Sequence, residues 1–139
     1  MKPMLGVIYD FNHDEIYWGH KESKAYIDDR EICVSSISKK SESTLVTGIP
    51  AKTNYSDSEF SEMISYFQAW KKIRMIGSAA MAACYVASGK AETYKEDGIF
   101  LWDIAAGAAI VNAAGGLASI TDIQNDYRVN AKFTNNIIE

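Results

Sequence analysis

Several features that mark other protein classes are scarce or absent in this chain of 139 residues. It contains only two prolines, and no basic run is longer than two lysines. The first residues carry no apolar segment of a secretory signal, and no stretch approaches the ~20 apolar residues of a membrane-spanning helix. The net charge is -4, from 14 basic and 18 acidic residues, which disfavours binding to a nucleic-acid backbone. We therefore expect neither a nucleic-acid nor a membrane partner.

Cysteine is equally scarce, and its placement suggests a reducing compartment. Cys33 and Cys84 stand far apart in apolar stretches, without the spacing of a metal site. This predicts two buried free thiols and a cytoplasmic location. The chain is 47% hydrophobic and 23% charged, as in ordinary globular proteins, and its length predicts a single domain over residues 1–139.

The first third of the chain has the alternation and turn residues of short strands. Residues 4–19 predict a β-hairpin, because apolar positions alternate around the turn residues Asn12 and Asp14. His13 and His20 flank its second strand, where they are expected on the surface. Further strands are predicted over three short segments, 25–27, 32–34 and 44–47.

The remaining two thirds alternate between helices and strands. Ser56 and Glu59 have the spacing of a capping box, which predicts a helix to about residue 71. Two further helices, 79–87 and 104–114, are apolar on every side and must be buried. Strands are predicted over residues 73–76, 91–95, 117–121 and 127–133. The pattern indicates an α/β fold, with a layered mixed sheet and buried helices.

Few residues stand where chemistry is expected. Asp103 is predicted at the start of the third helix, where it either caps the helix or serves as a ligand. Glu96 follows a predicted strand and is either a solvated loop residue or a functional carboxylate. Ser78 and Ala79 open a buried helix, whose free amides either bind an anion or are capped by the serine.

Four segments carry a specific resemblance. The sequence WDIAAG at 102–107 is followed by AAGG at 113–116, and RMIGSAA at 74–80 precedes both. Together with YVASG at 85–89, they resemble the inositol monophosphatase family along nearly the whole chain. The resemblance is to the C-terminal half of that family, and it implies the corresponding half of the inositol monophosphatase and fructose bisphosphatase-like fold.

The resemblance also implies an activity and residue roles. It implies a Mg²⁺-dependent phosphomonoesterase acting on inositol phosphate or a similar small sugar or polyol phosphate. Asp103 would ligate Mg²⁺, Glu96 would contact substrate hydroxyls, and Ser78 and Ala79 would present backbone beside the substrate. A bisphosphate nucleotidase or a fructose bisphosphatase-like enzyme, with a nucleotide or sugar bisphosphate as substrate, is the alternative within the superfamily.

Most of the metal ligands of the family lie in two motifs that this chain lacks. No glycine is followed by glutamate, and neither Pro3 nor Pro50 follows an aspartate, so Gly-Glu-Glu and Asp-Pro-x-Asp-Gly are both absent. Because Mg²⁺ needs several converging oxygens, we expect the chain alone to bind it no better than about millimolar and to be inactive. We also expect an exposed apolar face, and hence a homo-oligomer or a separate N-terminal half as partner. A non-catalytic oligomerising fragment is the third alternative.

Overall fold

A computed structural model describes residues 3–49 and 54–138. The first strands form an antiparallel sheet, sheet A, with the order β1-β2-β3-β4. Its members are β1 (Leu5–Asp10), β2 (Glu15–His20), β3 (Ala25–Ile27) and β4 (Arg30–Ile32). The predicted hairpin is therefore confirmed, whereas the strand expected at 32–34 lies two residues earlier.

The later strands form a second, mixed sheet, sheet B, with the order β6-β5-β7-β9-β8. Its members are β5 (Thr44–Thr47), β6 (Lys72–Met75), β7 (Thr93–Phe100), β8 (Leu117–Thr121) and β9 (Arg128–Thr134). Strand β5 is parallel to both of its neighbours, β6 and β7, while β9 is antiparallel to β7 and β8. The mixed sheet predicted from the sequence is thus confirmed.

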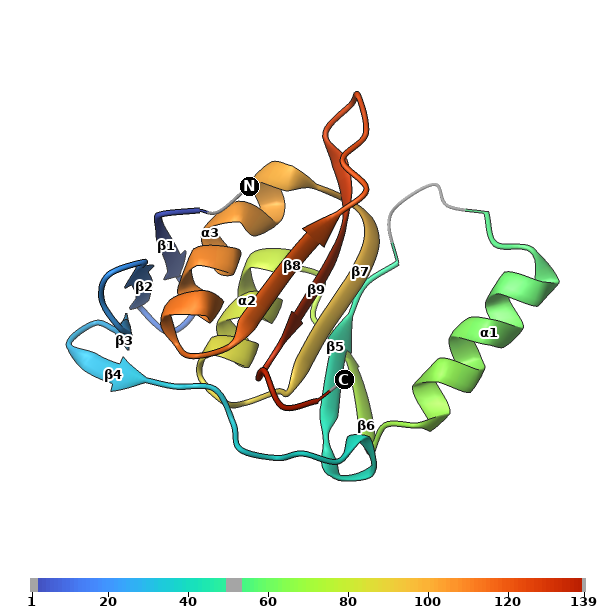
Figure 1. Ribbon diagram of the computed structural model, residues 1–139, viewed down its shortest axis with the longest axis horizontal. Helices are drawn as coiled ribbons and strands as arrows, with labels where there is room; N and C mark the ends of the chain where they lie inside the picture. Colours follow the sequence, from blue (N-terminus) through green and yellow to red (C-terminus); the bar gives the residue numbers. More distant parts are fainter. Residues whose placement is uncertain (1–2, 50–53, 139) are drawn as a thin grey trace.

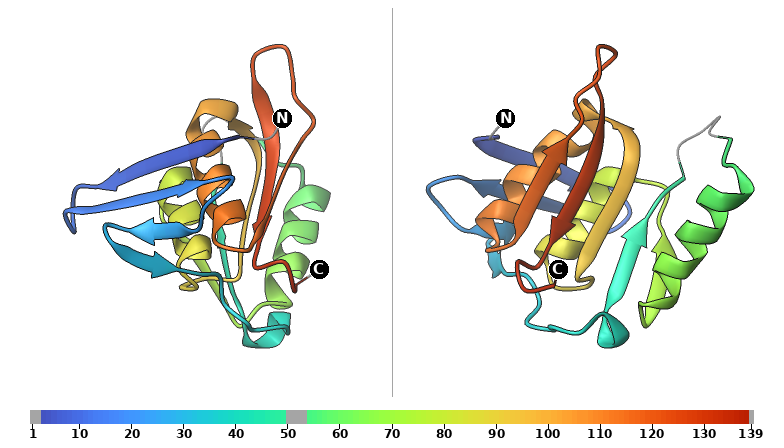
Figure 2. Two further views of the ribbon diagram at one scale, coloured as in Figure 1. Left: turned by 60° about the vertical axis from the view of Figure 1, so that its left-hand side comes forward. Right: turned by 45° about the vertical axis from the view of Figure 1, so that its right-hand side comes forward.

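Two helices fill the space between the sheets. Helices α2 (Ala79–Ala87) and α3 (Leu101–Ala113) lie between sheet A and sheet B, as Figures 1 and 2 show. Both contain fully buried residues along most of their length, as their all-round apolar sequences predict. Gly107 of α3 faces Ala83 of α2, and this absence of a side chain lets the two helices approach closely.

Helix α1 (Asp57–Gln68) stands apart from this core. The predicted capping box is present, because Ser56 and Glu59 each accept a hydrogen bond from the other's backbone. No residue of α1 is fully buried, and it lies beside the β5 and β6 end of sheet B (Figure 1). Its contacts come from Tyr66 and Phe67, which pack on a small cluster around Leu45 and Trp70. Helix α1 therefore packs on the surface of sheet B through few contacts and is not part of the core.

A buried carboxylate ties the connection after β4 to sheet B. Glu92 is 3% exposed, and it accepts hydrogen bonds from the Ser35 hydroxyl at 2.8 Å and the Thr44 amide at 2.6 Å. Asn135 adds to the same anchor, since its side chain donates to the Ile37 carbonyl at 2.8 Å. These contacts join residues 48 to 98 positions apart, and local sequence patterns do not reveal them.

Two expectations need correction. Helix α3 begins at Leu101 with Phe100 as its N-cap, so Asp103 lies within the first turn and does not cap the helix. Strand β7 continues to Phe100, which places Glu96 in a strand rather than in a solvated loop. Asp97 and Gly98 indicate a turn, but the strand continues past them. A β-bulge between Glu96 and Ile99 accommodates these two residues, and Gly98 adopts a φ of 75°.

The cysteine prediction is half right. Cys84 is buried in α2, and desolvation raises the pKa of its thiol to about 12. Cys33, however, is exposed just beyond β4, because the shift of that strand turns the residue out of the core. None of the described helices is long and apolar enough to cross a membrane.

Candidate functional site

The carboxyl ends of three parallel strands meet at one edge of sheet B. From β5 the chain leads to β6 through α1, and from β6 to β7 through α2, so the connections diverge at β5. In open α/β sheets such a divergence leaves a crevice beyond the strand ends, where ligands bind. A cavity of about 400 Å³ lies there, and its polar walls come from Thr47, Ser78 and Glu96.

Glu96 is held in this cavity by its neighbours on sheet B. Its carboxylate accepts a hydrogen bond from the Tyr94 hydroxyl at 3.0 Å. Gly48, just after β5, leaves room for it, since a side chain at position 48 would overlap the Glu96 carboxylate. Burial raises the pKa of Glu96, the Tyr94 hydrogen bond opposes that rise, and the negative charge of Asp103 adds to it. Glu96 is thus a positioned, partly desolvated acid.

The raised pKa predicts a pH-dependent gain in stability for Glu96→Gln. Above its raised pKa the half-buried carboxylate is charged and destabilises the folded chain, whereas below its ordinary value of 4.5 it is protonated in both folded and unfolded states. Glu96→Gln should therefore raise the thermal midpoint at pH 7, and the gain should vanish near pH 4. Thermal unfolding at both pH values measures this, with the exposed Glu22→Gln as control. An equal gain at both pH values would contradict the assignment.

The first turn of α2 forms the opposite wall of the cavity. Ser78 is the N-cap, and its hydroxyl accepts a hydrogen bond from the Met81 amide at 3.3 Å. Gly77 precedes it with a φ of 76°, a conformation that favours glycine. The remaining amides of the first turn, including that of Ala79, have no partner within the helix and carry partial positive charge. This turn is suited to an anionic group of a ligand.

Asp103 lies on the other side of the same helix start. A second hollow of about 400 Å³ is lined by Ser78, Ala79, Trp102 and Asp103. The Asp103 side chain is exposed to this hollow from the first turn of α3. Trp102 is oriented by stacking on Phe100, with ring centroids 4.7 Å apart. The start of α2 therefore separates the hollow that holds Glu96 from the one that holds Asp103.

The structure thus brings together all four residues singled out from the sequence. Ser78 and Ala79 line both hollows, with Glu96 in one and Asp103 in the other. Sequence reasoning missed Gly48 and Tyr94, which position Glu96. Gly48 could have been noticed only from its position at the end of a predicted strand. Tyr94 could have been noticed because it lies two residues before Glu96 and would therefore point to the same side of a strand.

The carboxylates of this site do not complete a magnesium site by themselves. Within residues 3–49 and 54–138, no group of three or more His, Cys, Asp and Glu side chains is arranged to hold a metal ion. Mg²⁺ retains its water shell unless several oxygens converge on it. No reaction step can therefore be derived through a metal held by this chain alone.

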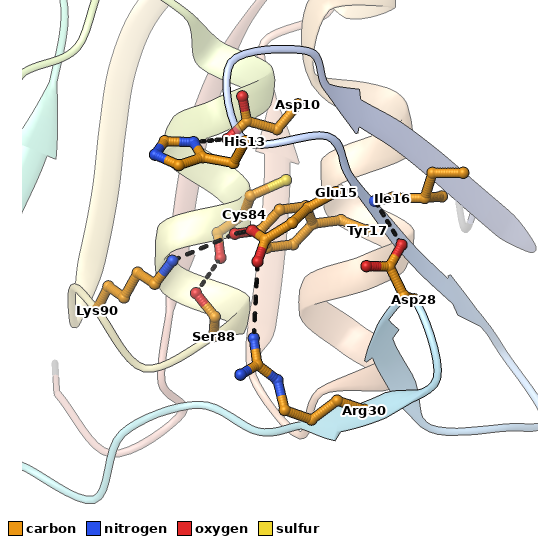
Figure 3. A network of polar contacts seen from close by, with 10 residues as sticks. All are labelled: Asp10, His13, Glu15, Ile16, Tyr17, Asp28, Arg30, Cys84, Ser88 and Lys90. Carbon is orange, nitrogen blue, oxygen red and sulfur yellow. Dashed lines mark hydrogen bonds and ion pairs between the residues drawn. The ribbon is translucent and has the colours of Figure 1, made fainter.

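A second polar network lies away from these hollows, where the β1-β2 hairpin meets the end of α2. Figure 3 shows Asp10 bound to His13, with Nδ1 to Oδ2 at 2.7 Å, and Lys90 donating to the Tyr17 hydroxyl at 3.3 Å. The hydrogen bond from His13 lowers the pKa of the Asp10 carboxyl. His13 is exposed at the surface, as predicted, but its pairing with Asp10 was not foreseen. The Asp10–His13 contact closes the hairpin turn, and the hydrogen bond of Lys90 joins strand β2 to the segment after α2.

Comparison with known proteins gives consistent results. The family model described as the inositol monophosphatase family matches residues 1–136. The chain is 38% identical over 114 residues to the Nus factor SuhB of Pasteurella multocida, covering 81% of this chain and 43% of the relative. It is 32% identical to the inositol-1-monophosphatase of Mesorhizobium japonicum, covering 86% of this chain and 45% of that protein.

Solved structures show the same relationship at the level of the fold. The inositol monophosphatase from Anabaena superimposes with a TM-score of 0.85 and 33% identity, over 97% of this chain and 55% of that chain. The SuhB protein of Bartonella henselae gives a TM-score of 0.81 at 28% identity, over 96% of this chain and 52% of that one. The chain therefore spans about half the length of the relatives it matches.

Proposed function

The chain belongs to the inositol monophosphatase family, and we propose that it contributes one side of the active site of a Mg²⁺-dependent phosphomonoesterase. The observation that carries this proposal is the placement of Glu96 and Asp103 in two hollows that both border the start of α2, where the first amides have no partner within the helix. Amides suit a phosphate group, while carboxylates repel it unless a cation lies between them. A cation-assisted phosphate site accounts for both kinds of group in one place.

Each residue then has a distinct role. Asp103 would supply one oxygen ligand to Mg²⁺, which when bound neutralises charge on the phosphate ester. The amides around Ser78 and Ala79 would orient the phosphate, and Glu96 would accept hydrogen bonds from substrate hydroxyls. Because further ligands are needed, we propose that the chain alone binds Mg²⁺ weakly and hydrolyses no phosphomonoester.

The charge around Glu96 favours a polyol over a doubly phosphorylated substrate. Asp97 and Glu96 both line a neighbouring hollow under α1, together with Glu59 and Glu62. Among the described residues that line this hollow, a second phosphate on the substrate would meet four carboxylates and the ammonium group of Lys95. We therefore propose inositol phosphate or a similar small polyol phosphate as the substrate, with a nucleotidase or fructose bisphosphatase activity as the alternative. We also propose a cytoplasmic location, which fits the exposed free thiol of Cys33.

The metal assignment can be tested on the chain as it exists. Mn²⁺ added at about millimolar concentration should broaden the amide NMR signals of residues around Asp103, because a paramagnetic ion relaxes only nearby nuclei. Asp103→Asn should remove this local broadening, whereas the matched control Asp29→Asn, in an exposed turn of sheet A, should leave it unchanged. Broadening centred elsewhere, or insensitive to Asp103→Asn, would refute the role of Asp103.

Activity of the same preparation is tested separately. The purified chain with Mg²⁺ and inositol 1-phosphate should release no phosphate above the buffer rate. Measurable turnover that co-purifies with the full-mass chain would show that the site is complete without further ligands, and would overturn that part of the proposal.

A further inference from the structure

Strand β7 changes its alternation of sides just after Glu96, the acid of the candidate site. Tyr94 before it and Ile99 after it both pack on the same buried core, although they lie five positions apart. In a regular strand, residues at such an odd spacing point to opposite faces. The bulge resolves this conflict by adding one residue to β7. Glu96 lies opposite Ala131, and the next pair, Ile99 with Val129, leaves two residues of β7 facing one residue of β9.

The bulge has two possible positions along the strand. In the observed register, Asp97 and Gly98 together face Asn130, and Glu96 points into the cavity. If the bulge moved one pair earlier, Asp97 would lie opposite Ala131 and would replace Glu96 on the inner side. The core residues before and after the bulge would keep their partners, so burial of the core does not distinguish the two registers. The position of the bulge therefore decides which of two consecutive carboxylates faces the cavity.

Two side chains of β9 bind the backbone of the bulge in the observed register. Asn130 lies between the buried Val129 and Ala131, so its side chain is on the outer side of the sheet. There its Oδ1 accepts a hydrogen bond from the Gly98 amide at 3.1 Å, and the Arg128 guanidinium donates to the Gly98 carbonyl at 3.4 Å. A Cβ at Gly98 would meet nothing within 4 Å, so its φ of 75° is the reason that glycine suits this position. These contacts stabilise the bulge where it stands.

We propose that Asn130 is a positioning residue, which selects Glu96 rather than Asp97 as the carboxylate of the cavity. It acts by holding the Gly98 amide and hence the bulge. The role rests on the proposed function, in which Glu96 accepts hydrogen bonds from substrate hydroxyls. A shifted bulge would present a carboxylate one methylene group shorter to the Tyr94 hydroxyl, which now donates to Glu96 at 3.0 Å. Bulges beside binding sites redirect side chains in this way.

NMR of the full chain tests this role without substrate or metal. In the native chain, the cross-strand contacts of Ala131 should come from Glu96. Asn130→Ala removes the acceptor of the Gly98 amide, and contacts from Asp97 to Ala131 should then appear. The Gly98 amide should exchange with solvent about three- to tenfold faster, which corresponds to the loss of one hydrogen bond. Circular dichroism checks that the variant folds, and Asn130→Leu, similar in size but without an acceptor, gives a second test.

The acidity of Glu96 provides a second readout. Burial is the main cause of its raised pKa, so Asn130→Ala should increase the acid dissociation constant of its carboxyl about threefold or more, measured on the carboxyl carbon signal. Asn130→Asp keeps an oxygen acceptor and should restore the native contacts and the slow exchange of Gly98. The matched control is Asn112→Ala, because the Ala118 amide donates to Asn112 Oδ1 at 2.9 Å near the far end of α3. It removes the same kind of hydrogen bond and should leave the acidity of Glu96 unchanged.

Two results would overturn the proposal. If Ala131 kept its native contacts in folded Asn130→Ala and Asn130→Leu, the bulge would be fixed without Asn130. If Asn112→Ala changed the acidity of Glu96 equally, the effect would reflect a general loss of stability. Either result would leave the proposed function standing, because metal binding and phosphate release are measured separately. A failure of the proposed function would appear in those measurements and would not alter the contacts of Ala131.

Discussion

Asp103→Asn should abolish phosphate release in an enzyme whose active site this chain completes. Such an enzyme is a chimera in which residues 3–138 replace the matching part of the Mesorhizobium japonicum inositol-1-monophosphatase, to which the chain is 32% identical. We expect a loss of at least about 100-fold in kcat/KM, because an amide oxygen without charge is a poor substitute for a carboxylate on Mg²⁺. Phosphate release from inositol 1-phosphate measures it.

Two further variants show whether the loss comes from the metal. Asp29→Asn, far from both hollows on sheet A, should leave kcat/KM of the chimera unchanged. Glu96→Gln should mainly raise KM, because it weakens contacts to substrate hydroxyls and leaves the metal ligand in place. If Asp103→Asn retained near-parental activity while the chimera remained folded and active, Asp103 would not be a ligand, and the proposed division of roles would be wrong.

Gly107→Val should destabilise the chain more than any exposed substitution. A side chain at position 107 would overlap the Ala83 methyl group where α3 crosses α2, in the centre of the core. Overpacking of this kind costs about 1–3 kcal/mol or more, against a total folding free energy of about 5–15 kcal/mol for a domain. Chemical denaturation followed by circular dichroism gives the free energy of unfolding.

A compensating variant separates overpacking from other causes. Gly107→Ala alone should destabilise, even though alanine is the better helix former. In Gly107→Ala/Ala83→Gly the methyl group moves from one helix to the other, and the combined loss should be smaller than the sum of the single losses. Strict additivity of the two single changes would mean that the helices separate freely, and that the close contact is not required.

The parts of the fold that depend on local patterns were predictable from the sequence. The alternation around the first turn, the Ser56 capping box and the all-round apolar helices each identified an element, and the structure confirms them. The prediction that Glu96 lies in a loop was wrong, because Asp97-Gly98 indicated a turn but the strand continues through a bulge. The prediction that Cys33 is buried was also wrong, because the strand predicted at 32–34 lies two residues earlier.

The candidate site was predictable only as separate residues. Ser78, Glu96 and Asp103 could be singled out, but periodicity gives no information on which strand ends meet. The support around Glu96 depends on contacts between β5 and β7, such as the space left by Gly48. Glu92 shows the same limit, since its hydrogen bonds join segments 48 and 57 positions apart. Such contacts arise from tertiary packing and leave no local pattern.

The loose attachment of α1 has a consequence for how such a site can evolve. Tyr55, Glu59, Glu62 and Met63 form the outer side of the hollow beside Glu96, yet α1 buries none of its residues completely. Mutations there change few core contacts and therefore cost little folding free energy. The shape and charge of this side of the hollow can thus change in evolution at little cost, while the close packing of the buried helices resists changes in side-chain volume.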